Sequence, residues 1–198
     1  SQSAAVSPEV WGRDYVGQGN GSEVAVARFG LDCTASEFRA LWKLRFMEAT
    51  AVPGAIPLLK GFDELFSVAR AQDLKVAVAS SSEGTVLRHK LRSGVLANSE
   101  VASALSDFDL ILSNDNVTRR KPDPEIYLLA ASELGVAPEQ CLVIEDSETG
   151  VLAGSRAGMR VVAVPHQYSA SHDFSPADLV VESMLDVADL LSGKSRAN

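Results

Sequence analysis

Residues 142–150 read LVIEDSETG, and this stretch decides the fold of the chain. Its apolar run stops abruptly at two adjacent carboxylates, Glu145 and Asp146, before a glycine and a helix-like segment. Such a run is typical of a strand that is buried on both faces of a parallel sheet. Ligands of open α/β sheets bind where these strands end, and paired carboxylates are good ligands for Mg²⁺. The alternative interpretation is that Asp146 or Ser147 only caps the next helix.

The rest of the core shows the same alternation of strands and helices. Apolar runs predict further strands at residues 76–79, 110–112, 161–164 and 179–181. Helical patterns precede or separate them, at residues 55–72, at 83–92, from Asp123-Pro124 to about Gly135, and from the acidic pair to Gly158. Strands that alternate with helices predict parallel βαβ units, so we expect an α/β fold with a doubly wound, Rossmann-like sheet.

The first part of the chain lacks any buried-strand pattern. Ser7 and Pro8 suit the start of a helix, and residues 17–21 are rich enough in glycine to form a loop. Helices are expected at residues 22–29 and 34–49, and a Pro-Gly pair at 53–54 then marks a change of character. The pattern predicts two domains, a small helical module at residues 7–52 and a core at 53–198.

Composition and charge exclude several classes of function. A net charge of −8 over 198 residues, without a long run of Lys or Arg, argues against nucleic-acid binding. No apolar stretch approaches the roughly 18 residues that a membrane span requires. Cys33 and Cys141 lie far apart in the sequence, which predicts free thiols in a reducing compartment. We expect the cytoplasm, or the reducing stroma or matrix of an organelle after a targeting segment has been removed, because the chain begins at Ser1 without a signal peptide.

Three polar features follow predicted strands directly. The first is Ser80-Ser81-Ser82, whose hydroxyl and backbone N–H groups lead into a helix N-terminus and predict an anion site. The alternative is simple capping of that helix by a serine. The second is Lys121, which Pro122 would hold in a fixed place where its charge stabilises a transferring phosphate. The alternative there is a solvated basic loop. The third is the acidic pair described above.

The order of these features resembles the haloacid dehalogenase superfamily of phosphohydrolases, over nearly the whole chain. The resemblance implies that Ser80 binds the transferring phosphate, that Lys121 contacts it, and that Glu145 and Asp146 bind Mg²⁺. The wording of residues 121–127 and 143–147 is similar to the branch that contains β-phosphoglucomutase and related sugar-phosphate phosphatases. It implies a Mg²⁺-dependent phosphatase of small phosphorylated metabolites.

Substrate-binding residues follow from the same resemblance. Ser81 belongs to the phosphate loop. The resemblance also implies that the helical module at residues 7–52 is a partial cap, and that Gly17 and Asn20 fall in the cap loop that helps to choose the substrate. The phosphoglucomutase-like members have an Arg where Asn20 stands, and an amide offers neither the charge nor the fork of a guanidinium. This departure favours a plain phosphatase over a mutase. No role is assigned to His166, which follows the predicted strand at 161–164.

One motif of the family is missing from the chain. The family's nucleophile is the first Asp of a D-x-D motif after an opening strand, and its second Asp acts as general acid and base. The single D-x-D here, at residues 107–109, precedes its strand and does not qualify, and neither does Asp115. Without the opening strand, the central position of the sheet would be empty and its neighbours would expose unpaired backbone groups.

Three explanations of this gap stay open. The whole polypeptide has further residues before this chain, a partner chain supplies the strand, or the sheet is rebuilt in a repurposed fold. The alternative function is accordingly a noncatalytic protein, a pseudoenzyme that binds a phosphorylated ligand or serves as a subunit of a complex. A haloalkanoate dehalogenase ranks third, because it has no use for a Mg²⁺-binding pair.

Overall fold

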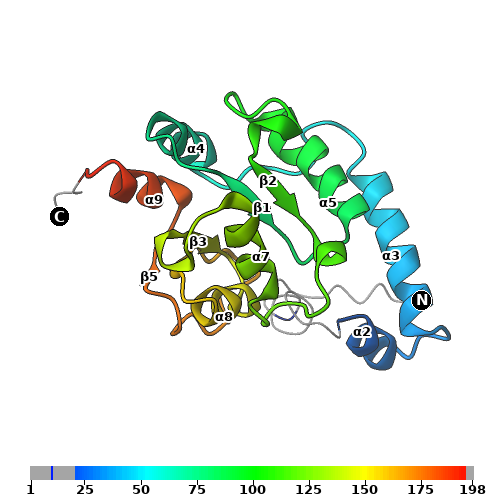
Figure 1. Cartoon of the computed structure of the whole chain (residues 1–198). Helices are drawn as coiled ribbons and strands as arrows, with labels where there is room; N and C mark the ends of the chain where they lie inside the picture. Colours follow the sequence, from blue (N-terminus) through cyan, green and yellow to red (C-terminus); the bar gives the residue numbers. More distant parts are fainter. Residues whose placement is uncertain (1–9, 11–20, 195–198) are drawn as a thin grey trace.

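The computed structural model describes Val10 and residues 21–194 of the chain (Figure 1). The α-helices of this part are α2 (Gly21–Phe29), α3 (Ala35–Ala49), α4 (Phe62–Ala71), α5 (Gly84–Lys90), α6 (Leu96–Asn98), α7 (Glu125–Leu134), α8 (Glu148–Arg156) and α9 (Met184–Leu191). The strands are β1 (Ala77–Ala79), β2 (Leu110–Leu112), β3 (Leu142–Glu145), β4 (Arg160–Ala163) and β5 (Leu179–Val180). Short turns of helix lie between them, η1 (Leu91–Val95), η2 (Leu105–Asp107), η3 (Asn114–Asn116) and η4 (Pro138–Gln140).

All pairings between the described strands are parallel, as the βαβ pattern predicts, but the strands form two separate sheets. One sheet holds β1 and β2, and the other has the order β3-β4-β5. A cavity of about 750 Å³ lies between them and is lined by residues 76–79 on one side and 142–145 on the other. The α/β, Rossmann-like fold class is therefore confirmed, with a sheet that is divided between β1 and β3.

The free edges of β1 and β3 follow from the alternation of their backbone groups. In β1, Val76 accepts a hydrogen bond from Asp109 and the N–H of Ser80 donates to Leu112, so even-numbered residues bond to β2. Residues 77 and 79 therefore direct their N–H and C=O groups toward the cavity. Beside β3, Cys141 accepts from Arg160, the first residue of β4, and Glu145 accepts from Val164, the residue after β4, which leaves residues 142 and 144 directed toward the same cavity.

The main core surrounds the β3–β4 pair. Val151, Ala153, Val161 and Ala163 are fully buried there, between the sheet and helices α7 and α8. Gly154 permits this close approach, because a Cβ at its position would lie 2.9 Å from the side chain of Val161. On the opposite face, α4 and α9 pack together over a second cluster: Leu65, Val162, Val164, Val187 and Ala188. Both faces of β4 are thus covered, which explains its uninterrupted apolar sequence.

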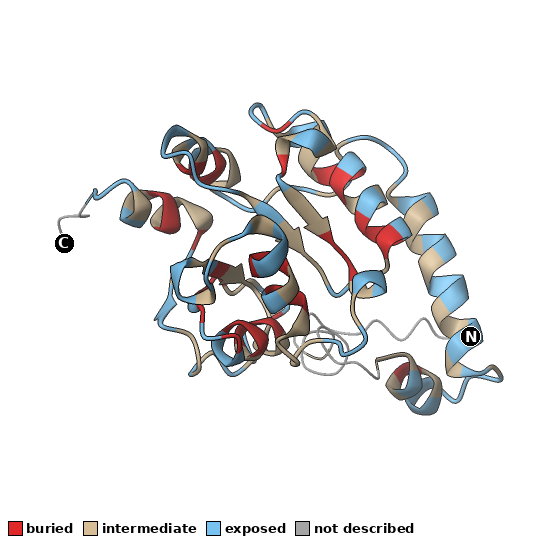
Figure 2. Cartoon of the chain, in the orientation of Figure 1, coloured by how far each residue is buried: buried red, intermediate tan, exposed pale blue. Residues whose placement is uncertain are grey.

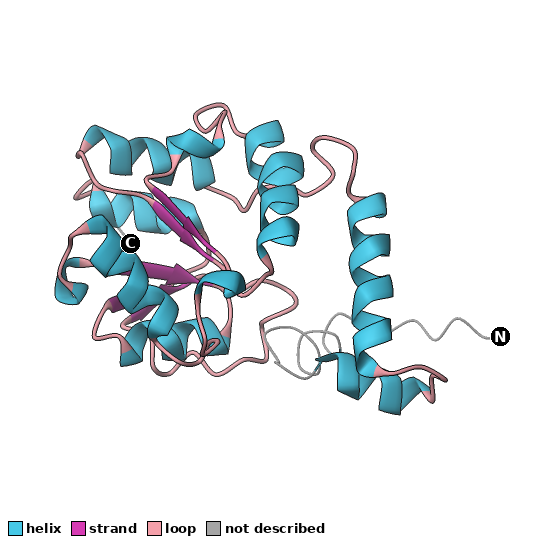
Figure 3. Cartoon of the chain, turned by 45° about the vertical axis from the view of Figure 1, so that its right-hand side comes forward, coloured by secondary structure: helices cyan, strands magenta, loops and turns pink. Residues whose placement is uncertain are grey.

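Helices α2 and α3, called the outer helices below, lie to one side of both sheets (Figure 3). Thr34 caps α3 through a capping box with Glu37, with a distance of 3.2 Å from the Glu37 N–H to Thr34 Oγ1. No residue of α3 is buried, and Leu41 and Leu44 are each 54% exposed (Figure 2). The outer helices therefore contribute little to the core.

The predicted elements agree with the structure except at the helix expected over residues 55–72. That prediction is wrong in its first part, because α4 begins only at Phe62. Pro57 has no N–H to donate, and Gly61 adopts a left-handed conformation with φ of 87°. The helix expected at 83–92 begins one residue later and passes after Lys90 into a π-helical turn, η1. The predicted helix start at Ser7 and residues 17–20 of the predicted loop lie outside the described residues, whereas Gly21, the last residue of that loop, is the first residue of α2.

Candidate active site

The polar residues predicted from the sequence meet at the carboxyl ends of the parallel strands. Ser80 follows β1 directly, Asn114 comes two residues after β2, and Asp146 follows β3. The hydroxyl of Ser80 accepts a hydrogen bond from the N–H of Ser82 at 3.1 Å. Among the described residues, no group accepts from the N–H of Ser81, so this donor is available to an anion.

Lys121 joins the two sheets at this edge. Its ammonium group donates to the backbone oxygen of Ala79 at the end of β1 at 3.0 Å, and to Glu145 at the end of β3 at 2.5 Å. The hydroxyl of Tyr127 lies 2.8 Å from the same ammonium group and donates to Glu145. The side chains of Lys121 and Glu145 are only 4% and 10% exposed. The lysine is therefore a buried, fixed cation beside Ser80.

Burial also affects Tyr127. Desolvation raises the pKa of its phenol well above the usual range, and the neighbouring Glu145 carboxylate acts in the same direction. The phenol consequently keeps its proton and acts as a hydrogen-bond donor to Glu145. This donor helps to hold the carboxylate against Lys121.

Gly150, in the first turn of α8, makes room for the Glu145 carboxylate. A Cβ at this position would lie 2.0 Å from Glu145 Oε2, which is far inside van der Waals contact. The same oxygen accepts a hydrogen bond from Ser147, and the Ser147 side chain also caps α8. The capping interpretation therefore applies to Ser147, and Asp146 does not cap the helix.

Asp146 presents the carboxylate that is accessible at this edge, with a side chain 46% exposed. Its Oδ2 lies 3.0 Å from Nε2 of His166, in the loop after β4. Burial acts to raise the pKa of Asp146, but the hydrogen bond from His166, the backbone N–H of Asp146 and the charge of Lys121 together outweigh it, and the pKa is lowered. Asp146 is therefore ionised at neutral pH.

Asp146 suits a hard cation such as Mg²⁺ by its chemistry. Glu145, predicted as the second metal ligand, has both carboxylate oxygens engaged, one by Lys121 and Tyr127 and the other by Ser147. No group of three or more His, Cys, Asp or Glu side chains that could hold a metal occurs in the described part of the chain. Asp146 can accordingly provide one ligand, and the remaining ligands must be oxygens from other sources.

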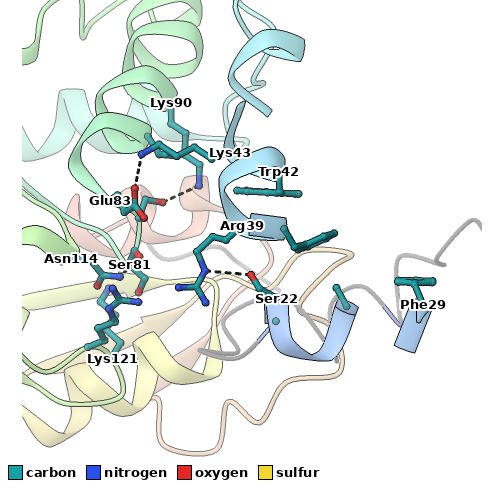
Figure 4. Close-up of a pocket in the computed structure, with 16 residues that line it drawn as sticks. Ser22, Phe29, Arg39, Trp42, Lys43, Ser81, Glu83, Lys90, Asn114 and Lys121 are labelled. Atoms are coloured by element: carbon teal, nitrogen blue, oxygen red, sulfur yellow. Dashed lines mark hydrogen bonds and ion pairs between the residues drawn. The ribbon is translucent and has the colours of Figure 1, made fainter. Parts of the chain in front are cut away.

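A cavity of about 350 Å³ opens between this edge and the outer helices (Figure 4). Ser81, Asn114 and Lys121 line it from the core, and Trp42 and Arg39 of α3 face them from the opposite side. Further lining residues include Ser82, Glu83, Lys90 and Arg120 from the core, and Ser22, Phe29, Phe38 and Lys43 from the outer helices. The cavity is therefore rich in cationic groups on both sides and has aromatic side chains on the side of the outer helices.

Lys90 differs from three of the other cations around this cavity. Arg39, Lys43 and Lys121 each pair with a carboxylate, at 3.4, 2.6 and 2.5 Å. Lys90 instead donates to the Ser82 hydroxyl at 3.1 Å and lies over the ring of Phe46. Desolvation lowers the pKa of Lys90, although the charge of Asp146 opposes the shift. An anionic ligand would supply the opposite charge that this half-buried ammonium group lacks.

The structure brings most of the predicted site residues together. Ser80, Ser81, Lys121, Glu145 and Asp146 lie at one edge, whereas Gly17 and Asn20 fall outside the described residues. The rejected D-x-D lies at the other end of β2, where Asp107 accepts from the N–H groups of residues 103 and 104, and Asp109 accepts from Val76. Asp115 bonds to the N–H of Gly84 at the start of α5.

Two residues at the site carry no signal of their own in the sequence, because Lys90 sits in an ordinary helical pattern and His166 stands in a loop without a motif. Tyr127 ends the stretch 121–127 that resembles the family, but that stretch does not indicate what its hydroxyl group contacts. Their roles depend on which strand and helix ends lie next to each other. The register of β3 with β4, which pairs Glu145 with Ala163, is what places His166 beside Asp146.

The described helices include none with the length and apolarity needed to traverse a lipid bilayer.

Comparisons with known proteins agree with this geometry. Protein CbbY of Rhodobacter capsulatus is 37% identical over 134 residues, which cover 68% of this chain and 56% of the relative. Hexitol phosphatase A of Escherichia coli is 32% identical over 156 residues, or 76% of this chain and 63% of the relative. The chain thus spans less than two thirds of the length of these relatives.

Solved structures show the same fold. CbbY of Rhodobacter sphaeroides in complex with phosphate superposes with a TM-score of 0.68 at 28% identity, over 79% of this chain and 67% of that one. Residues 8–158 match the family of haloacid dehalogenase-like hydrolases. The match extends over most of the chain, and it includes the buried lysine, the serine loop and the acidic pair of the site. The chain belongs to the haloacid dehalogenase-like hydrolase family.

Proposed function

We propose that the protein is a Mg²⁺-dependent phosphatase of small phosphorylated metabolites, with sugar phosphates as the substrate class. The carrying observation is the buried ammonium group of Lys121, which lies at the ends of both sheets and lines the cationic cavity. A fixed cation in a site of low water content stabilises the charge of a transferring phosphoryl group. The names of relatives such as hexitol phosphatase A support the same class of reaction.

Each residue of the edge has a role in this proposal. Lys121 and the hydroxyl of Ser80 bind oxygens of the transferring phosphoryl group, and the free N–H of Ser81 adds a donor. Glu145 keeps Lys121 in position through the 2.5 Å ion pair. The outer helices form the cap, and their side chains contact the rest of the substrate, as does the predicted cap loop with Gly17 and Asn20.

Asp146 is the residue that we assign to Mg²⁺. When bound there, the metal neutralises phosphate charge and fixes the geometry of in-line displacement. The side chain of Asp146 is partly exposed and accessible to a metal ion, whereas Glu145 is paired with Lys121. We therefore assign to Glu145 the positioning of the lysine, and its predicted role as second ligand needs a separate test.

The nucleophile has to come from the segment that fills the divide between β1 and β3. We propose that an apolar strand inserts there, parallel to both neighbours, and carries a carboxylate at its end beside Lys121. The backbone groups of residues 77 and 79 on one side and 142 and 144 on the other offer it a complete ladder. The strand is supplied either by the same polypeptide or by a partner chain.

Hydrogen exchange tests the inserted strand. In the full-length protein, the amides of residues 77, 79, 142 and 144 should exchange slowly, as central-strand amides do. The amides of Leu179 and Val180, in the outermost described strand, serve as the comparison for a partly free edge. Fast exchange at all four cavity-facing positions would show that nothing pairs with these strands.

Activity tests the phosphatase itself. We would measure phosphate release from p-nitrophenyl phosphate and then from a panel of sugar phosphates, with Mg²⁺ and with EDTA. Lys121→Met should lower turnover by about 100-fold or more, since removing one stabilising group from such a site costs this much. Asp146→Asn should abolish the response to Mg²⁺. Turnover that survives both changes would overturn the proposal.

The alternative is a noncatalytic protein of the same fold. Two observations favour it: the sheet is divided, and the described residues include no aspartate that qualifies as the nucleophile. Such a protein would bind a phosphorylated ligand or a partner at the same edge. Titration with inorganic phosphate distinguishes the two. Binding that Lys121→Met weakens, without any turnover in the full-length protein, would establish the alternative.

The compartment is also a proposal. Cys33 and Cys141 are both free, as expected for a reducing environment. We propose the cytoplasm or the stroma or matrix of an organelle. Localisation of a tagged full-length protein, with staining of its free thiols after isolation, tests this.

A further inference from the structure

The loop that follows β4 is folded back on itself around His166. The N–H of His166 donates to the hydroxyl of Ser169 at 3.1 Å, and the N–H of Ser169 donates to the backbone oxygen of His166 at 2.9 Å. Ser169 is fully buried, so this pair of bonds is shielded from water. The backbone of His166 is therefore anchored, and the direction of its side chain is defined.

A second contact fixes which nitrogen of the imidazole carries the proton. The backbone N–H of Tyr168 donates to Nδ1 of His166 at 3.0 Å, and an N–H donor requires a nitrogen lone pair there. The neutral ring must then carry its hydrogen on Nε2, and this nitrogen faces Oδ2 of Asp146 at 3.0 Å. The edge of the Tyr168 ring closes the other side, with 5.8 Å between the ring centroids.

We infer that His166 is a positioning residue, which donates one hydrogen bond from Nε2 to Asp146 and thereby turns the other carboxylate oxygen toward a bound divalent cation. The inference rests on the proposed function, because it concerns the metal ligand of that site. His166 is the only side chain among the described residues that hydrogen-bonds to Asp146. Without it, the half-exposed carboxylate would rotate freely.

The physical basis is the conformational entropy that a carboxylate side chain loses when it binds a metal ion. A carboxylate that already occupies one rotamer loses less entropy when a cation binds than one that samples several. Groups that orient a metal ligand from behind commonly change metal affinity by 10-fold to 100-fold when they are removed. A group that only positions the ligand should affect the affinity for the metal far more than turnover at saturating metal.

The test compares His166→Gln with His166→Leu in the full-length protein. A glutamine amide reaches about as far as Nε2 and can still donate to Asp146, whereas leucine fills the space without a donor. The dissociation constant for Mg²⁺, measured by calorimetry without substrate, should rise about 10-fold in His166→Leu. It should return close to the original value in His166→Gln.

Two further measurements separate positioning from other roles. Long-range ¹⁵N NMR of the unaltered protein should show His166 with its proton on Nε2 and a bare Nδ1. Turnover of His166→Leu should approach that of the unaltered protein once Mg²⁺ is saturating. If turnover stays low at saturating Mg²⁺ in both variants, His166 acts in the chemistry and the inference is wrong.

The failures of the two proposals are distinguishable. If the unaltered protein binds Mg²⁺ and His166→Leu binds it equally tightly, this inference alone is overturned. If the unaltered protein shows no saturable Mg²⁺ binding, the proposed function and this inference fall together. A loss of thermal stability in His166→Leu and His166→Gln alike, without a change in Mg²⁺ affinity, would show a purely structural role.

Discussion

The two walls of the cavity are built in different ways. On the core side, Lys121, Tyr127 and Glu145 form a buried network whose charged side chains are at most 10% exposed. On the outer side, Lys43 of α3 pairs with Glu83 across side chains that are 32% and 45% exposed, and Trp42 is 40% exposed. Buried charges are costly to leave unpaired, whereas exposed pairs contribute little.

This difference in burial agrees with the role of each wall in the proposed function. The transferring phosphoryl group needs groups held in one geometry, because misplacement of a charged group is expensive in rate. The outer helices have to let a substrate enter and leave, and weak contacts permit that. Thr50 and His89 add one hydrogen bond of 2.8 Å to the contact between α3 and α5. Changes on the core wall should therefore have large effects, and changes on the outer wall small ones.

Gly150→Ala should have the largest effect. The new methyl group would lie 2.0 Å from Glu145 Oε2, so the carboxylate must leave its place and release Lys121. We expect a loss of about 1 to 3 kcal/mol in the free energy of unfolding from overpacking. Turnover per folded molecule should fall by about 100-fold, because the fixed cation is no longer held. Urea denaturation and steady-state kinetics measure the two effects.

Gly154→Ala is the matched control, since it lies one turn later on the same helix. Its methyl group would meet Val161 at 2.9 Å and Val143 at 3.1 Å, away from any charged group. A comparable loss of stability is expected, with turnover per folded molecule unchanged. Equal losses of turnover in both variants would mean that turnover depends on the packing of α8 in general and not on the position of Glu145 beside Lys121.

Tyr127→Phe comes next in size. It removes a hydroxyl that touches both Lys121 and Glu145 inside the buried network. Loss of a hydrogen bond to charged groups should cost about 1 to 3 kcal/mol of stability. Turnover should fall by roughly 10-fold, since the ion pair stays but loses a support.

Tyr168→Phe serves as the control for this change, because that tyrosine is 38% exposed and contacts His166 through its ring and backbone. It should change the free energy of unfolding by less than about 0.5 kcal/mol and turnover by less than about twofold. A Tyr127→Phe variant that behaves like this control would show that the phenol is dispensable.

The contrast between the walls also explains what could be predicted from the sequence. Residues 142–150 predict a strand, an acidic edge and a following helix, because each depends on neighbours in the chain. The same holds for Ser80 and Lys121, which follow strands. Parallel strands bring their carboxyl ends to one edge, so the meeting of these residues follows from topology alone.

Other features depend on contacts between distant segments and leave no local pattern. The start of α4 is set by Gly61, where a Cβ would lie 2.1 Å from the backbone nitrogen of Leu185, at the start of α9. The bond between His166 and Asp146 depends on the register of β3 with β4. The position of Lys90 over Phe46 depends on how α3 docks on α5.

Lys90→Met should have a smaller and opposite effect on stability. A lysine whose pKa is lowered by desolvation binds its proton more weakly in the folded than in the unfolded state. The penalty is fully present below the lowered pKa, and stability rises as pH increases from the lowered pKa toward the ordinary value of 10.5. Lys90→Met should thus raise the free energy of unfolding at pH 7 by up to about 1 kcal/mol.

The gain should shrink as the pH approaches 10.5, where the unaltered protein no longer carries the penalty. Affinity for inorganic phosphate should fall several-fold at the same time, since Lys90 lines the cavity. Lys60→Met, at an exposed lysine, should change neither quantity. Thermal unfolding across pH and phosphate titration check both effects, and a destabilised Lys90→Met at pH 7 would contradict them.

The smallest effect is expected for the ion pair between Lys43 and Glu83. The two atoms lie 2.6 Å apart, but both side chains are about a third or more exposed, so water and salt screen the attraction. A double-mutant cycle of Lys43→Met and Glu83→Gln should give a coupling of about 0.5 kcal/mol at low salt, and less at high salt. The pair joins α3 to the start of α5, so its loss should also loosen the outer wall. A coupling well above 1 kcal/mol that survives high salt would place this wall in the same class as the buried network, and the outer helices would then be a fixed part of the site rather than a movable cover.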